Sequence, residues 1–89
     1  MKISEDEEIL ICNKAINTFG QAMQKVVAME EMAELTQAIS KSIRDKKHNV
    51  EEEIADVEIM LTQLKIMYDM GKVEEFREAK LKRLKGVVY

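Results

Sequence analysis

Residues 50–70 read VEEEIADVEIMLTQLKIMYDM, and this stretch decides the fold. Its large apolar residues recur at the spacing of one helix face, where each residue advances by about 100° around the axis. These residues are Val50, Val57, Met60, Leu61, Leu64, Met67 and Tyr68. Glu, Leu, Met and Ala favour helices, and Gly71 is a typical residue just past a helix end. The pattern therefore predicts a helix over residues 50–70.

The segment before this helix predicts a second helix that pairs with it. Helix-forming residues run without proline from about residue 21 to residue 44. The polar stretch RDKKHN at residues 44–49 then indicates a turn, and Asn49 is the expected N-cap of the next helix. We therefore expect a helical hairpin in this part of the chain.

The two ends of the chain predict one helix each. Ser4 is the expected N-cap of the first helix, and Glu7 is spaced to complete a capping box. This helix is expected to end near Gly20. Its predicted core residues are Ile9, Leu10, Ala15, Ile16 and Phe19. The last helix is expected over residues 72–85, before Gly86.

Composition supports a single domain over residues 1–89. Proline is absent, and only three of the 89 residues are glycine, so little interrupts the helices. A chain this short buries only about 60–65% of the surface that its unfolded form exposes, and association between copies is a common remedy. The predicted fold is an all-α four-helix bundle that assembles as a homo-oligomer.

Charge, cysteine content and hydropathy disfavour several classes of protein. The net charge of −3 argues against a general nucleic-acid binder. The lone Cys12 cannot form an internal disulfide, which fits a reducing cytoplasm. The uncharged apolar runs are far shorter than a membrane span, and the acidic N-terminus is unlike a signal peptide. We therefore expect a cytoplasmic protein that binds neither nucleic acid nor membranes.

Acidic residues form one motif on each helix of the predicted hairpin. The helix expected over residues 21–44 carries Glu30, Glu31 and Glu34, and the helix expected over residues 50–70 carries Glu53 and Asp56. A spacing of three places two side chains on one helix face. Glu53 and Asp56 fall inside the apolar stripe of their helix, whereas Glu31 and Glu34 border the stripe of theirs. Solvated glutamates are common, and acids in a first turn favour the helix dipole, so either motif alone is ordinary. Two motifs together indicate a shared site.

Carboxylates that converge inside a helical bundle need compensation. Burial costs several kcal/mol per unpaired ion and raises carboxyl pKa values. A divalent cation offsets this cost, and carboxylate oxygens suit Mg²⁺ or Mn²⁺. If the two helices are aligned at their ends beside the turn, the acidic motifs are offset along the hairpin by roughly 9 Å, at a rise of 1.5 Å per residue. Six loop residues can span up to about 20 Å, so the loop can bring the motifs level.

The spacing EExxE at residues 30–34, followed by ExxD at residues 53–56, resembles the MazG-like family of all-α nucleoside triphosphate pyrophosphohydrolases. Local similarity to the short phage- and bacterial-type members covers FG at 19–20, Gln24, EEIADV at 52–57, VEEFR at 73–77 and KLKRL at 80–84. The resemblance extends from about residue 17 to residue 84. It implies a helical fold, dependence on Mg²⁺, and hydrolysis of nucleoside or deoxynucleoside triphosphates between the α and β phosphates. The products would be a nucleoside monophosphate and pyrophosphate.

Carried over to this chain, the resemblance implies four metal ligands, which are Glu31, Glu34, Glu53 and Asp56. Glu30 would be a further acid beside them, or the base that deprotonates the attacking water. Lys80 and Arg83 lie three apart on the last helix and would contact the substrate phosphates. Gln24 could read a base edge. A solvated basic helix end explains Lys80 and Arg83 equally well, and a capped or solvated amide explains Gln24 equally well.

Two alternative functions stay open. Phosphoribosyl-ATP pyrophosphohydrolase shares the broad fold, but both acidic motifs look more like the short MazG-like type. A non-catalytic helical interaction module would keep the bundle, but it would have no reason to retain unpaired carboxylates in its core. The leading expectation is a housecleaning enzyme of the nucleotide pool that acts as a homodimer or a dimer of dimers. Ile59 and Ile66 point away from Val57 and offer a second apolar face for such an assembly.

Overall fold

Four helices make up the part of the chain that the structure, a computed structural model, describes, which is residues 2–89. They are α1 (Glu5–Phe19), α2 (Gln21–Ile43), α3 (Val50–Met67) and α4 (Met70–Val88). This part contains no strand, so the predicted all-α class is confirmed. None of the four helices is long and apolar enough to cross a membrane.

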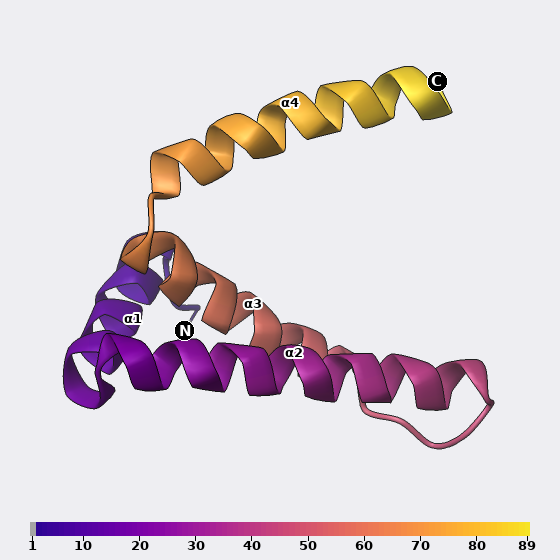
Figure 1. Cartoon of the computed structure of the whole chain (residues 1–89), viewed down its shortest axis with the longest axis horizontal. Coiled ribbons are helices and arrows are strands. Elements are labelled where there is room, and N and C mark those ends of the chain that lie inside the picture. The colour runs from indigo at the N-terminus through magenta and orange to yellow at the C-terminus, as the bar shows by residue number, and fades with distance from the viewer. Residues whose placement is uncertain (1) are drawn as a thin grey trace.

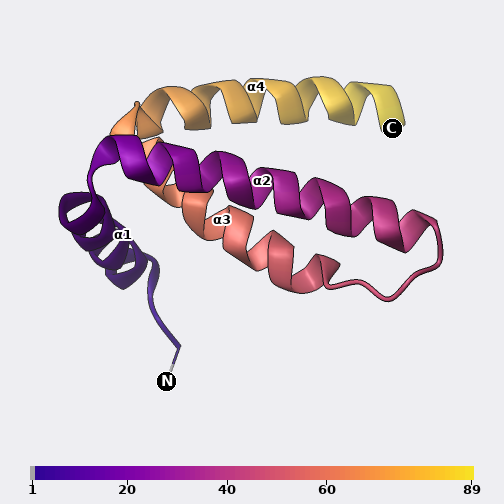
Figure 2. The ribbon, with the colours of Figure 1, turned by 60° about the horizontal axis from the view of Figure 1, so that its bottom comes forward.

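Helices α2 and α3 form an antiparallel hairpin, and α1 lies across one end of it (Figures 1 and 2). The turn over residues 44–49 joins the pair, as predicted, and Asp45 takes up a left-handed conformation there with φ of 57°. Helix α1 contacts both helices of the hairpin. The small apolar core lies where the three helices meet and consists of Cys12, Ile16, Ala28, Ala38, Val57 and Met60.

Helix α1 begins and ends where the sequence predicts. The Ser4 side chain accepts a hydrogen bond from the Glu7 backbone N–H at 3.1 Å, and Gly20 ends the helix with φ of 91°. The predicted core face was partly wrong, because Leu10 and Phe19 are 69% and 63% exposed. The hairpin covers only a narrow stripe of α1, centred on Cys12 and Ile16, so these two residues lie outside the contact.

The boundary between α3 and α4 was predicted too late in the sequence. Helix α3 ends at Met67, and α4 already begins at Met70, so Gly71 lies inside α4 rather than after α3. The cause is Asp69, whose carboxylate accepts a hydrogen bond from the Lys72 backbone N–H at 3.0 Å and caps the new helix. The predicted stop before Gly86 was also wrong, because α4 continues to Val88.

Helix α4 projects from the other three helices (Figure 1). None of its residues is buried, and among the described helices it contacts α3 alone. The radius of gyration is 15.5 Å, against about 12 Å for a compact chain of this length. A single copy is therefore a three-helix unit with an extended arm, not a closed four-helix bundle.

A buried pair of amides joins α2 to α3. The Gln24 Nε2 group donates a hydrogen bond to the Gln63 Oε1 atom at 2.8 Å. Both side chains are almost fully enclosed. A buried amide that lost its partner would keep its desolvation cost without the hydrogen bond, so the pair should act as one unit.

We predict that Gln24→Ala lowers the free energy of unfolding by about 1–3 kcal/mol, because it leaves the buried Gln63 amide without a hydrogen-bond partner. The loss is measured by urea denaturation followed by circular dichroism. Replacing both residues with leucine should cost less than the single change, since neither amide is then left unpaired. Gln37→Ala, at an exposed site on the same helix, is the control. An equal loss in Gln24→Ala and Gln37→Ala would contradict the structural role.

Candidate metal centre

The hairpin brings acids from both predicted motifs together. Glu31 and Glu34 on α2 and Glu53 on α3 each offer a carboxylate oxygen, and these three oxygens lie within 4.8 Å of one another. The offset expected from counting residues is thus taken up by the turn over residues 44–49. We call Glu31, Glu34 and Glu53 the acidic cluster.

Two oxygens of the acidic cluster are buried and have no hydrogen-bond partner among residues 2–89. These are Oε2 of Glu31 and Oε2 of Glu53. Glu53 is only 8% exposed, and its other oxygen, Oε1, accepts a hydrogen bond from the Asn49 Nδ2 group at 2.8 Å. Buried polar atoms are normally satisfied, so these oxygens call for a partner other than residues 2–89, such as a cation or a water molecule.

No basic side chain in the described chain neutralises the acidic cluster. The ion pairs within residues 2–89 are Lys65 with Glu74 at 3.5 Å and Lys82 with Glu78 at 3.9 Å, and both lie elsewhere. A buried carboxylate ordinarily needs a paired charge or a metal. The cluster therefore carries negative charge that residues 2–89 leave uncompensated.

Burial and mutual repulsion raise two carboxyl pKa values. The pKa of Glu31 is raised chiefly by burial, and the neighbouring charges of Glu34, Asp56 and Glu53 add to this effect. The pKa of Glu53 is also raised chiefly by burial, although its hydrogen bond from Asn49 opposes the shift. Both directions express the same fact, namely that the site disfavours several negative charges without a cation.

The acidic cluster fits a hard divalent cation. Octahedral ligands at about 2.1 Å from Mg²⁺ lie at most about 4.2 Å apart. The three oxygens lie within 4.8 Å of one another. A small rotation of one side chain would bring them within the distance that a shared Mg²⁺ requires. Glu31, Glu34 and Glu53 would be the direct ligands. Asp56 lies half-buried beside them, and its charge acts on both Glu31 and Glu53.

Glu30 and Asn49 are two further residues that adjoin members of the acidic cluster. Glu30 lies in the exposed part of α2, outside the group of close oxygens. Asn49 was predicted only as a helix cap, but its side chain makes no capping hydrogen bond and instead donates one to the Glu53 carboxylate. The spacing of four residues between Asn49 and Glu53, across a helix start, was the signal available in the sequence.

The remaining predicted site residues lie away from the acidic cluster. Gln24 is buried against Gln63, so its amide is already engaged within the chain. Lys80 and Arg83 line a shallow hollow of about 350 Å³ on α4, together with Phe76 and Ala79. Because α4 contacts only α3 and then projects outward, one copy of the chain does not bring these two cations to the acids.

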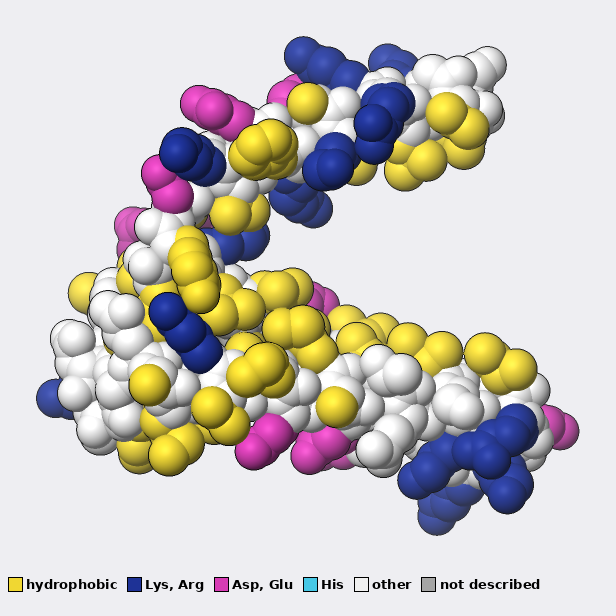
Figure 3. All heavy atoms as spheres, in the orientation of Figure 1, with side chains coloured by type: hydrophobic (Ala, Val, Ile, Leu, Met, Phe, Trp, Pro, Cys, Tyr) yellow, Lys and Arg dark blue, Asp and Glu magenta, His cyan; other side chains and the backbone are white. Residues whose placement is uncertain are grey.

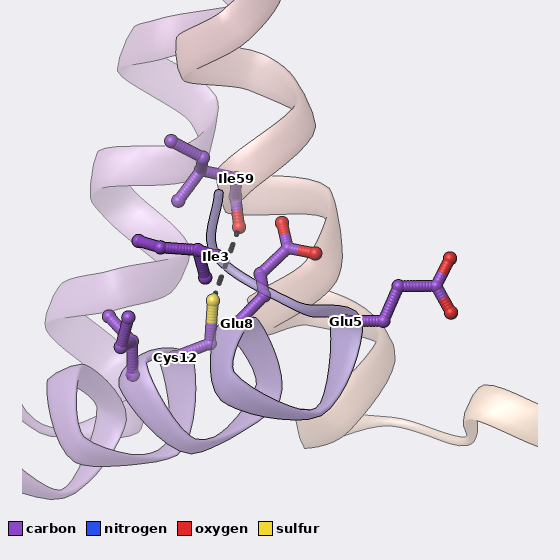
Figure 4. Close-up of a pocket in the computed structure, with 6 residues that line it drawn as sticks. Ile3, Glu5, Glu8, Cys12 and Ile59 are labelled. Carbon is purple, nitrogen blue, oxygen red and sulfur yellow. Dashed lines mark hydrogen bonds between the residues drawn. The ribbon is translucent and has the colours of Figure 1, made fainter. Parts of the chain in front are cut away.

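A second hollow lies between the start of α1 and the middle of α3 (Figure 4). Its volume is about 360 Å³, and Ile3, Glu8, Cys12 and Ile59 are among its lining residues. The thiol of Cys12 donates a long hydrogen bond to the Ile59 backbone oxygen at 4.0 Å. Burial, and secondarily the charge of Glu8, raises the pKa of this thiol. Cys12 is therefore protonated at neutral pH and is a poor nucleophile.

The raised pKa values predict how stability depends on pH. Above the ordinary carboxyl value of 4.5, the folded chain holds protons on Glu31 and Glu53 that the unfolded chain has lost. The contribution of these groups to the free energy of unfolding is therefore fully present below pH 4.5 and is lost as pH rises through the raised pKa values. The free energy of unfolding of the wild type minus that of Glu53→Gln, measured by urea denaturation in EDTA, should therefore fall as the pH rises from 4.5 to 8.

Glu51→Gln is the matched control, since Glu51 is exposed in the same helical turn. The difference between wild type and Glu51→Gln should not fall in this way. Addition of Mg²⁺ at neutral pH should raise the stability of the wild type more than that of Glu53→Gln. A pH-independent difference between wild type and Glu53→Gln would refute the uncompensated cluster.

Comparison of the chain with models of protein families, with characterised proteins and with solved structures finds no match. The resemblance to the MazG-like family therefore depends on the spacing of the acidic motifs and on their local sequence. The geometry of the acidic cluster is an independent observation, since it comes from the packing of α2 against α3.

Proposed function

We propose that this chain is a Mg²⁺-dependent nucleoside triphosphate pyrophosphohydrolase. It would hydrolyse ribo- or deoxyribonucleoside triphosphates to a nucleoside monophosphate and pyrophosphate, as a housecleaning enzyme of the cytoplasmic nucleotide pool. Mn²⁺ would be an alternative metal, because it prefers the same oxygen ligands. The assignment combines the resemblance of the two acidic motifs with the chemistry of the site that they form.

One observation carries the proposal, namely the two buried and unpartnered carboxylate oxygens of Glu31 and Glu53. They come from different helices, and the third acid, Glu34, is exposed beside them. A site with buried ligands on one side and an exposed ligand on the other lets a cation be held by the protein while phosphate oxygens approach from solvent. Mg²⁺ sites in nucleotide enzymes commonly combine a few carboxylates with substrate phosphates.

The reaction requires water to attack the α phosphorus while the bond from that phosphorus to the bridging oxygen breaks. Pyrophosphate leaves with the bridging oxygen, and the water proton passes to a base. Glu30 would take that proton, because it lies next to Glu31 in the chain and is free of the buried cluster. A bound divalent cation would offset charge on the phosphates and make water easier to deprotonate.

Contacts with the rest of the substrate would involve more than one copy of the chain. Lys80 and Arg83 are exposed cations of the type that binds phosphate, but they lie on the projecting α4. Gln24 would have to give up its hydrogen bond to Gln63 before its Nε2 group could read a base. A homodimer or dimer of dimers, as the resemblance implies, could supply the cations from a neighbouring chain.

We expect pyrophosphate to be released in one step when the protein is incubated with Mg²⁺ and a panel of nucleoside and deoxynucleoside triphosphates. The products are separated by ion-exchange chromatography. No diphosphate should accumulate, because the bond between the α and β phosphates is cleaved directly. Orthophosphate and a nucleoside diphosphate as first products would disprove this cleavage site. Turnover of phosphoribosyl-ATP alone would favour the related enzyme class instead.

Neutral substitutions should separate the metal ligands from ordinary surface acids. Glu53→Gln should lower kcat by at least about tenfold, which corresponds to 1.4 kcal/mol of transition-state stabilisation. It should also weaken Mg²⁺ binding measured by calorimetry, while the helical circular dichroism signal stays unchanged. Glu51→Gln removes the same charge from an exposed site in the same turn and should act like wild type. Wild-type turnover in Glu53→Gln would remove Glu53 from the metal site.

A further inference from the structure

Asn49, the residue before α3, is joined to Glu53 by two hydrogen bonds. The Glu53 backbone N–H donates to the Asn49 backbone oxygen at 3.1 Å, and the Asn49 Nδ2 group donates to the Glu53 Oε1 atom at 2.8 Å. The first bond belongs to the first turn of α3 and fixes the backbone of Asn49. The second holds its side chain against the carboxylate. Because the two bonds close a ring, the amide and the carboxylate keep each other in one orientation.

The Asn49 side chain does not cap α3 in the usual way. Asparagine is favoured at this position because its side-chain oxygen accepts a hydrogen bond from an N–H group of the first turn. Asn49 makes no such bond. The Val50 backbone N–H donates instead to the Nδ1 atom of His48 at 3.3 Å. Formation of the helix start therefore does not account for the Asn49 amide.

The amide hydrogen bond makes the two carboxylate oxygens of Glu53 unequal. Oε1 accepts the bond from Asn49, whereas Oε2 is buried and has no hydrogen-bond partner among residues 2–89. An oxygen that accepts an amide hydrogen bond is less available to a cation than a free one. Glu53 therefore offers one oxygen to the acidic cluster rather than a pair.

A glutamate restricted to one oxygen discriminates between divalent cations. Mg²⁺ requires near-ideal octahedral geometry with ligands at about 2.1 Å, and it commonly combines one or two carboxylates with waters and phosphate oxygens. Ca²⁺ takes about six to eight oxygens at longer distances and can bind both oxygens of one carboxylate. An arrangement that engages one carboxylate oxygen with an amide thus suits the smaller ion.

A second carboxylate lies within reach of the same amide. The Asn49 Nδ2 group is 3.4 Å from the Glu52 Oε1 atom, against 2.8 Å from the Glu53 Oε1 atom. Hydrogen bonds from nitrogen to oxygen are normally no longer than about 3.2 Å. Glu52 is also exposed, whereas Glu53 is buried, and a hydrogen bond is stronger where water is excluded. The bond to Glu53 is therefore the one that orders the Asn49 side chain.

We infer that Asn49 is a positioning residue of the acidic cluster. Its amide holds Glu53 as a ligand that binds through Oε2 alone, and this restriction makes the cluster prefer Mg²⁺ to Ca²⁺. The inference rests on the proposed function only in taking the acidic cluster as a cation site. It deepens that proposal, because the resemblance gives Asn49 no role and the residue acts on the metal through Glu53.

Calorimetric titration of the full chain with Mg²⁺ and, separately, with Ca²⁺ tests the inference. The test variant is Asn49→Ser, because serine is as good an N-cap as asparagine but its hydroxyl group ends one atom short of the amide nitrogen. We expect Asn49→Ser to bind Mg²⁺ about tenfold more weakly than the wild type, as loss of a group that orients a metal ligand typically does. Its affinity for Ca²⁺ should change much less, so the ratio of Mg²⁺ to Ca²⁺ affinity should fall.

Three further variants separate the positioning of Glu53 from formation of the helix start. Asn49→Gln keeps the amide donor on a longer side chain but is not a favoured N-cap, and it should bind Mg²⁺ more tightly than Asn49→Ser. His48→Ala removes the other side-chain hydrogen bond at the start of α3, to the Val50 N–H, and should keep the wild-type ratio of affinities. In a Glu52→Gln background, Asn49→Ser should still lower this ratio. Circular dichroism compares the helix content of all variants.

Three results would overturn the inference. The first is an unchanged ratio of affinities in Asn49→Ser, whether both affinities stay the same or fall together. The second is weaker Mg²⁺ binding by Asn49→Gln than by Asn49→Ser, which would assign Asn49 to capping. The third is a wild type that binds neither ion.

Failure of the proposed function gives a different pattern. The wild type would then bind Mg²⁺ but release no pyrophosphate from any triphosphate. A fall in the ratio of affinities in Asn49→Ser would still support the role of Asn49, at a cation site that is not catalytic.

Discussion

The rest of the structure depends on the packing of α2 against α3. Ala28 and Ala38 of α2 are almost fully buried, and their small side chains let neighbouring helices approach α2 closely. The Gln24–Gln63 hydrogen bond sets the register of the hairpin from a polar pair within the interface. If the register shifted by one residue, each side chain in the interface would be replaced by its neighbour in the sequence, which points about 100° away around the helix axis. The Glu53 carboxylate would then no longer lie opposite Glu31. The position of the acidic cluster and the contact of α1 with both hairpin helices depend on this packing of α2 against α3.

The acidic cluster works against the contact that creates it. Burial of Glu31 and Glu53 without a paired cation raises their pKa values and opposes the packing of α2 on α3. The Asn49 amide relieves only one oxygen of Glu53. Binding of a divalent cation to the folded form alone would remove the repulsion and stabilise the hairpin by mass action. In the proposed enzyme, metal binding and hairpin stability are thus two measures of one interaction.

The sequence predicted what local patterns encode and missed what depends on packing. Apolar periodicity placed α2 and α3, and the spacing of three within each motif placed Glu31, Glu34 and Glu53 on facing sides. The end of α3 was predicted too late, because Gly71 is a typical residue after a helix end, whereas Asp69 already caps the next helix. Leu10 and Phe19 were predicted to lie in the core but are exposed. Apolar periodicity shows which side of a helix is apolar, but it does not show how much of that side the neighbouring helices cover.

The acidic cluster and the exposed apolar side chain of Met32 lie on opposite sides of α2. Glu34 follows Met32 by two residues and is therefore rotated by about 200° from it. In the proposed enzyme, substrate phosphates would approach the cluster from the side of Glu34, which is exposed. Lys80 and Arg83 lie away from the acids of their own chain, since α4 contacts only α3 and projects from the hairpin (Figure 3). If these cations bind the triphosphate, they must do so at the site of another chain. The phosphate contacts that the resemblance implies therefore require that α4 of one chain reaches the acidic cluster of another.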